Sequence, residues 1–155
     1  MNSDQIVRKQ LLALLGGKAH LGFEDAVSDF PLNEINRKLP DGSYTAWHLL
    51  EHIRIAQRDI LEYVRNPGHV SPEFPGGYWP RADETATAAK WGKTIEAVKA
   101  DLKEVEALVR NPKTDLFGPL SHDKECTVFQ QVLLVADHNA YHIGELVIFK
   151  RLYSH

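Results

Sequence analysis

The chain has 155 residues, of which 43% are hydrophobic and 25% are charged, and its formal net charge is −3. This length fits one domain over residues 1–155, and the balance of apolar and charged residues excludes a disordered chain. The acidic charge, without any run of Lys or Arg, argues against nucleic acid as a partner because phosphate binding needs a basic surface.

Neither a targeting segment nor a membrane span is indicated. The first ten residues are polar and have no apolar core of the signal-peptide type. Apolar runs such as 132–136 are far too short to cross a bilayer. The single cysteine, Cys126, cannot form an internal disulfide. We therefore expect a cytoplasmic protein that does not associate with membranes.

The N-terminal part predicts one helix and a second amphipathic piece. Ser3 is a candidate N-cap for a helix that runs to about Leu15, where two glycines interrupt it. The second piece covers 21–30 and ends at Pro31. The segment 31–42 follows as a connector, because it closes on the turn sequence Leu-Pro-Asp-Gly.

Two longer helices follow, separated by a loop. The first runs from about Ser43 to Arg65, where Asn-Pro-Gly stops it. The segment 67–80 contains four prolines and three glycines, so we expect an ordered or lid-like loop there. Asp83 is a candidate N-cap for the next helix, which continues to about Arg110.

The last helix begins near Thr127 and continues to about Tyr153. Thr127 and Gln130 match a capping box, in which each side chain accepts from the backbone N–H of the other residue. The run 132–136 is apolar on every face, so we expect it to be buried on all sides, by the bundle or by a partner subunit. Four substantial helices joined by two long loops predict an all-α fold of the four-helix-bundle type.

Eight histidines are many for this length, and four of them form two pairs with the same spacing. His138 and His142 are four residues apart on the last helix, which places both imidazoles on one face and close enough to share a metal ion. His48 and His52 repeat this spacing on the helix over 43–65. Imidazole suits Zn, Ni, Cu and Fe, and a ring buried in an apolar helix needs a partner such as a metal ion.

The number of histidines that take part decides which kind of site is predicted. Three ligands leave open positions for water or substrate, as in catalytic zinc sites, whereas a fourth from His48 would close the site. A third interpretation is a helical interaction protein whose buried histidines hold no metal. The residues alone leave open a metal-dependent enzyme, a non-catalytic metal-binding or stress-related module, and such an interaction protein.

The segments around the two pairs resemble the DinB-like superfamily, the group that includes the YfiT-type metal-dependent hydrolases. The matching segments are 47–52, Trp-His-Leu-Leu-Glu-His, and 137–145, Asp-His-Asn-Ala-Tyr-His-Ile-Gly-Glu. The loop 77–80, Gly-Tyr-Trp-Pro, is similar to one branch of that superfamily. The resemblance extends over nearly the whole chain in helix order and loop placement, and it implies the bundle topology of the group.

The resemblance also implies a ligand set and an activity. A family pattern ending in Leu-Leu-x-His falls on His52, and a His-x-x-x-His pair falls on His138 and His142. This implies a three-histidine site for a divalent metal ion, Zn or Ni, completed by water, with His48 outside the triad. Relatives include S-transferases and isomerases that use a low-molecular-weight thiol, so the implied protein is a homodimeric thiol transferase or hydrolase that acts on a small molecule.

Acidic and aromatic residues near the two histidine pairs are further candidate site residues. Glu145 lies three residues after His142 on the same helical face, and we predict it as the catalytic residue. It could orient a ligand imidazole, act as a general base or form an ion pair with a basic residue. Asp59 lines the face of His52 two turns along, either behind the ligand or as a solvated carboxylate. The aromatic residues at 78 and 79 close over a pocket or pin the loop to the bundle.

Overall fold

The computed structural model describes residues 2–17, 19–40 and 42–154. Within these ranges the regular structure is helical, with strand pairing limited to two isolated bridges. The α-helices are α1 (Ser3–Leu15), α2 (Phe23–Val27), α3 (Ala46–Arg65), α4 (Ala88–Arg110) and α5 (Val128–Tyr153), and a 3-10 helix, η1, covers Gly76–Tyr78.

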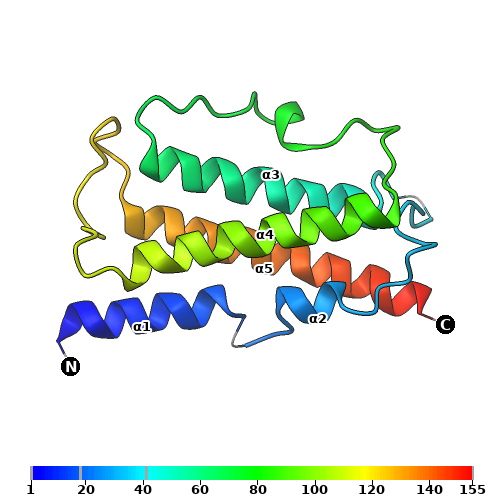
Figure 1. Cartoon of the computed structure of the whole chain (residues 1–155), viewed down its shortest axis with the longest axis horizontal. Coiled ribbons are helices and arrows are strands. Elements are labelled where there is room, and N and C mark those ends of the chain that lie inside the picture. The colour runs from blue at the N-terminus through cyan, green and yellow to red at the C-terminus, as the bar shows by residue number, and fades with distance from the viewer. Residues whose placement is uncertain (1, 18, 41, 155) are drawn as a thin grey trace.

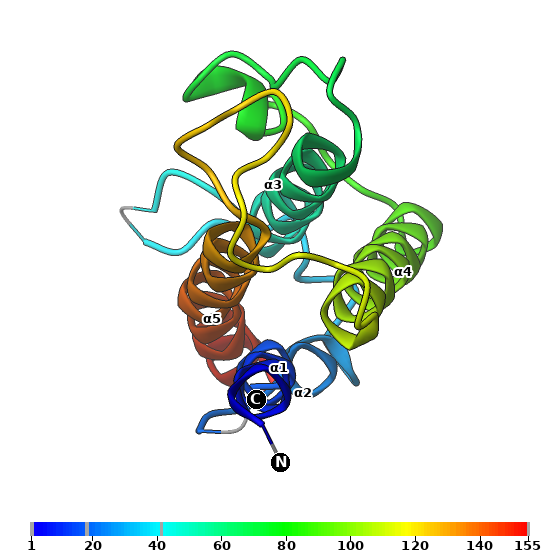
Figure 2. The ribbon, with the colours of Figure 1, turned by 90° about the vertical axis from the view of Figure 1, so that its left-hand side faces the viewer.

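These helices form a four-helix bundle, which confirms the predicted all-α fold class. In Figure 1, α3, α4 and α5 run alongside one another, while α1 and α2 follow each other along one edge. Seen end-on in Figure 2, α3, α4, α5 and the α1–α2 pair occupy four corners. The first helix of the bundle is thus divided in two, at the break where Gly17 adopts a φ of 68°.

The N-caps of α1 and α4 differ from those predicted. Asn2, rather than Ser3, caps α1 and accepts from the N–H of the third helical residue. Thr87, rather than Asp83, caps α4. The reason is tertiary, because the backbone N–H and C=O of Ala86 are both hydrogen-bonded to the side chain of Asn36, at 2.9 Å each. This segment therefore cannot join the helix.

α2 differs from the prediction in its bounds, and α5 differs in its N-terminal capping. The second helix covers only Phe23–Val27 instead of 21–30, because the chain turns at Asp29, whose φ of 51° is incompatible with a continuing helix. α5 begins after Thr127 as predicted, and the Thr127 hydroxyl accepts from the N–H of Gln130 at 3.1 Å. The reciprocal bond of the predicted capping box is not found among the described residues.

The core lies between α3, α4, α5 and the α1–α2 pair, and the side of α5 that faces it is buried. The bundle of one chain does not bury 132–136 on all sides: Val132 and Val135 are buried, whereas Leu133 and Leu134 are exposed, and their burial by a partner subunit stays a prediction. Successive residues of a helix point about 100° apart, so neighbours on one bundle can cover only part of its circumference. An exposed apolar face remains on α5.

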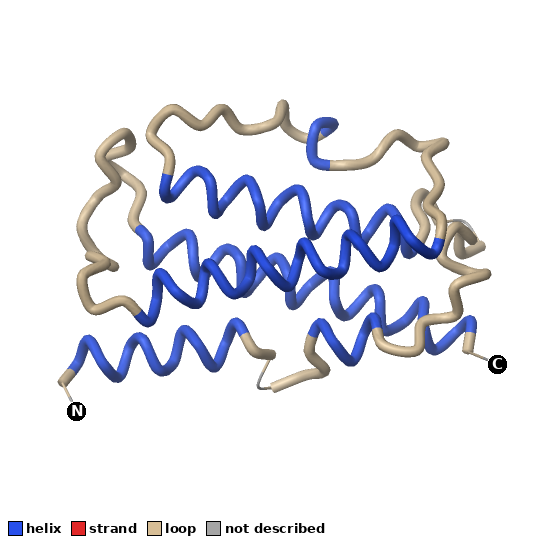
Figure 3. The backbone as a smooth tube through the Cα atoms, viewed as in Figure 1, coloured by secondary structure: helices blue, strands red, loops and turns tan. Residues whose placement is uncertain are grey.

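The connection between α3 and α4, residues 66–87, runs back along α3 instead of taking a direct path (Figure 3). It contains η1, and this 3-10 helix contacts α3. The predicted loop therefore lies over the helix that carries His48 and His52. Among the described residues, no helix has both the length and the apolar character that a bilayer crossing requires.

Candidate metal centre

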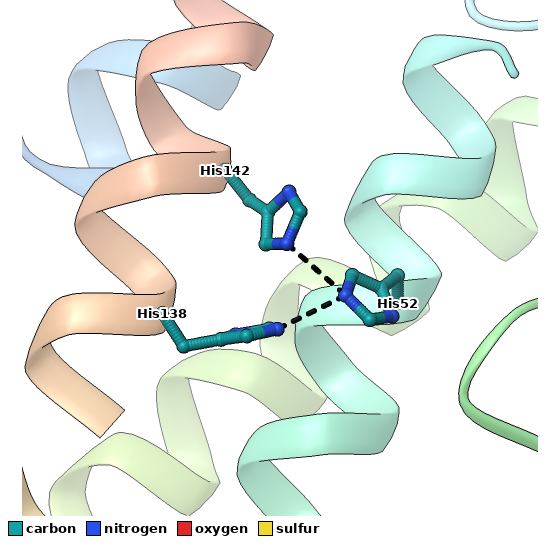
Figure 4. A group of neighbouring side chains, drawn as sticks. All are labelled: His52, His138 and His142. Carbon is teal, nitrogen blue, oxygen red and sulfur yellow. Dashed lines mark hydrogen bonds between the residues drawn. The ribbon is translucent and has the colours of Figure 1, made fainter. Parts of the chain in front are cut away.

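Three imidazoles from two helices meet at one point inside the bundle (Figure 4). His52 comes from α3, and His138 and His142 come from α5. The Nε2 atom of His52 lies 3.0 Å from Nε2 of His138 and 3.1 Å from Nε2 of His142. These atoms lie within 4.8 Å of one another, and the three residues form a group that could hold a metal ion.

The two separations from Nε2 of His52 fit neighbouring ligands of one divalent ion. With Zn–N bonds of about 2.0–2.1 Å and angles of roughly 90–110° at the metal, neighbouring nitrogens lie about 2.9–3.4 Å apart. The two Nε2–Nε2 distances fall inside this range. His138 and His142 each place a ring nitrogen at ligand spacing from Nε2 of His52, and the three nitrogens lie within 4.8 Å of one another.

Hydrogen bonds at the opposite ring nitrogens decide which nitrogen faces this point. Nδ1 of His52 donates to the carbonyl oxygen of Tyr78 at 2.7 Å, and Nδ1 of His142 donates to the carboxylate of Glu145 at 2.6 Å. Since both acceptors lack a proton to give, each Nδ1 carries the hydrogen, and in an uncharged ring Nε2 then presents a lone pair. Two lone pairs that face each other repel, and a cation between them removes the repulsion. The donor set thus fits a metal ion.

Burial keeps two of the rings in the form that binds metal. It is the main cause that lowers the pKa of His138 to about 4, and the neighbouring imidazoles lower it further. The pKa of His52 is also lowered, again mainly by burial. Both rings are therefore uncharged at neutral pH, and an uncharged imidazole can donate its lone pair to a cation.

Glu145 lies behind His142 rather than at the meeting point of the three nitrogens. Its Oε2 accepts from His142, and its Oε1 accepts from the hydroxyl of Tyr44 at 2.5 Å. The hydrogen bond to Glu145 is the main cause that raises the pKa of Tyr44 to about 12. Of the roles that the sequence left open, this placement favours orientation of the His142 ring. Action as a general base remains a prediction.

His48, the fourth histidine of the two pairs, lies outside the centre. Its Nδ1 is 2.6 Å from the hydroxyl of Thr45, and its Nε2 is 3.0 Å from the carbonyl oxygen of Arg81. His48 stands three residues after the N-cap Thr45, at the position where Glu or Gln completes a capping box, so this spacing in the sequence already indicates a capping role. The closed site of four histidines is not formed.

Aromatic side chains from the 66–87 connection cover one side of the centre. The indole of Trp79 stacks on the ring of His52, with the centroids 3.9 Å apart and the planes 4° apart. The ring of Tyr44, from the segment before α3, also stacks on this indole, with the centroids 5.3 Å apart. The two interpretations of Trp79 from the sequence are therefore compatible, because the same contact pins the loop and closes the site.

Comparison with known proteins agrees with this fold and this group of histidines. Neither the curated proteins nor the solved structures that were compared gave a match. The family model of the DinB superfamily, however, matches residues 22–146, which include all three converging histidines. Because this match spans most of the chain, the protein belongs to the DinB superfamily.

Proposed function

We propose that the chain is a metal-dependent enzyme for a small-molecule substrate, with a divalent ion held by His52, His138 and His142. The observation that carries this proposal is the convergence of their Nε2 atoms. In addition, a hydrogen bond at Nδ1 fixes the orientation of the His52 ring and of the His142 ring. Three imidazoles suit Zn or Ni. Three protein ligands leave a position open for substrate, whereas the closed alternative needs His48, which is bonded elsewhere.

Each neighbouring residue has a part in such a site. A divalent ion would act as a Lewis acid and lower the pKa of a water molecule or thiol. Glu145 holds the Nδ1 proton of His142, and the carbonyl of Tyr78 holds that of His52, so both rings present Nε2 to the centre. Trp79 covers one face of His52 and keeps water from that side.

We favour thiol transfer over hydrolysis because thiol S-transferases are among the DinB-like relatives that the sequence resembles. In such a transfer the thiol loses its proton to solvent, the sulfur bonds to an electrophilic carbon, and the leaving group departs with the electron pair of the broken bond. A cavity of about 450 Å³ lies along α3 and α5, and its lining includes Asp59 and Leu134 but none of the three histidines. This volume is in the range of small-molecule sites. A low-molecular-weight thiol also suits the cytoplasmic location expected from the sequence.

The test is thiol consumption by metal-loaded protein with a panel of low-molecular-weight thiols and electrophilic acceptors. We expect turnover that His138→Ala abolishes and that Glu145→Gln lowers by about 10–100-fold through weaker metal binding. Saturating metal should restore the rate of Glu145→Gln if Glu145 only orients His142, and should not restore it if Glu145 is the general base. His122→Ala, at an exposed loop histidine, is the matched control. A panel without metal-dependent turnover would contradict the enzyme.

We also propose that the chain forms a homodimer through the exposed apolar face of α5. Leu134, Tyr141 and Ile148 follow each other at seven-residue spacing and are 46%, 68% and 51% exposed. A stripe with this spacing is typical of helices that pack against a partner helix. Light scattering should give twice the chain mass of 17.5 kDa, and Ile148→Glu should give the chain mass. A monomeric wild-type protein would contradict the dimer.

A further inference from the structure

A buried carboxylate that takes no part in the group of histidines lies on α3, two turns beyond His52. Asp59 is only 8% exposed, so the solvated carboxylate that the sequence allowed is not what the structure contains. Its Oδ1 lies 2.7 Å from Nε2 of His69, and its Oδ2 accepts from the hydroxyl of Tyr78 at 2.7 Å. Both partners belong to the 66–87 connection. Asp59 therefore ties this connection to α3 at two points.

Tyr78 connects Asp59 to the candidate metal centre through two hydrogen bonds. Its hydroxyl is bound by Asp59, and its backbone carbonyl accepts the Nδ1 proton of His52. Burial and the hydrogen bond to Asp59 raise the pKa of Tyr78 to about 12, so its hydroxyl stays a donor at neutral pH. The next residue, Trp79, stacks on the same imidazole. The position of one loop residue thus determines two contacts of His52.

Apart from Trp79, the rest of this loop segment offers little apolar anchorage of its own. Before Tyr78, the large side chains of Val70 and Phe74 are exposed, and Trp79 is the large loop residue that packs against the core. η1 is a single 3-10 turn, and a turn of this length is not stable by itself. The Tyr78 carbonyl is therefore held over α3 from two sides, by the hydrogen bond of the Tyr78 hydroxyl to Asp59 and by the stacking of Trp79 on His52.

We propose that Asp59 is a positioning residue of the metal centre. By holding the Tyr78 hydroxyl, it places the Tyr78 carbonyl where it selects the Nδ1–H tautomer of His52 and leaves Nε2 free for the ion. This inference rests on the proposed function to the extent that His52 is a ligand. It adds a residue that touches neither metal nor substrate, and it predicts that metal affinity depends on a loop contact.

The decisive variant is Tyr78→Phe, which removes the hydroxyl and keeps the ring and the carbonyl. Tyr63→Phe is its matched control, because the Tyr63 hydroxyl also donates to a carboxylate, that of Asp123, at 2.7 Å. This bond is the main cause that raises the pKa of Tyr63 to about 12, whereas burial is the main cause for Tyr78. Tyr63 lies eleven residues beyond His52 on α3, about three turns away, and makes no bond to the loop carbonyl.

Dissociation constants for Zn²⁺ and Ni²⁺ are measured by competition with a chromophoric chelator. We expect Tyr78→Phe and Asp59→Ala to weaken binding on the order of tenfold, and Tyr63→Phe to change it by less than about twofold. The double variant should bind no more weakly than Asp59→Ala, because both changes break the same connection. Thermal unfolding of Tyr78→Phe and Tyr63→Phe should show similar shifts, which separates positioning from general stability.

A second measurement needs no metal. Long-range ¹H–¹⁵N NMR spectra of metal-free protein report the tautomer of each imidazole. We expect His52 to be in the Nδ1–H form in wild type and Tyr63→Phe, and in a mixture of tautomers in Tyr78→Phe. An unchanged tautomer in Tyr78→Phe would overturn the positioning role. A wild-type protein that binds neither ion would instead contradict the proposed function, while the NMR result would still decide the role of Asp59.

Discussion

Replacement of His138 with Ala is expected to lower the affinity for Zn²⁺ or Ni²⁺ by more than about 100-fold. Loss of a residue that merely orients a ligand costs about 10–100-fold, and loss of a ligand costs more. His138 is only half-buried, so its truncation should leave the bundle folded. Elemental analysis of untagged protein, prepared without chelators, together with titration calorimetry, measures the effect.

His48→Gln is the control for this variant. His48 has the same spacing from His52 that His142 has from His138, and Gln can keep the capping box at the start of α3. We expect this variant to bind metal as the wild type does. Metal binding that survives in His138→Ala, or that is lost equally in His48→Gln, would contradict the assignment of the three ligands.

Replacement of Leu50 with Ala is expected to lower the free energy of unfolding by about 2–5 kcal/mol. Leu50 is fully buried on α3, in the same cluster as Trp47 and Leu146, so the truncated side chain leaves a cavity that its neighbours cannot fill. Urea denaturation of the metal-free protein measures this loss and keeps metal binding out of the comparison.

Leu14→Ala removes the same atoms from a side chain on α1 that is 53% exposed. This variant should stay within about 0.5 kcal/mol of the wild type. Equal losses at the two positions would contradict the core as described here. The comparison also bears on the metal centre, since α3 carries both Leu50 and His52 and a loosened α3 would misplace the ligand.

The sequence was sufficient for those features that depend on local spacing. Apolar residues at helical intervals predicted the helices, and their ends at Leu15, Arg65, Arg110 and Tyr153 agree with the structure. A separation of four residues puts His138 and His142 on one face of any helix, whatever surrounds it. Family membership likewise follows from short motifs that the chain carries in order.

Residues with the same local sequence pattern can have different roles, and only the tertiary structure distinguishes them. His48 and His52 lie on one helix, four residues apart, yet His52 contacts His142 on α5 while His48 bonds to Thr45. Which neighbour a helical side chain contacts depends on how the helices pack. The start of α4 depends on Asn36, fifty residues away.

Asp59 was also indistinguishable from a surface carboxylate by sequence. Its partner Tyr78 lies in a loop whose path has no periodic signal. Spacing along the chain thus fixed which faces carry the histidines, whereas helix packing and the course of the 66–87 connection fixed what those faces meet. The physical reason is that periodicity describes a helix alone, while burial and hydrogen bonding depend on segments far apart in sequence.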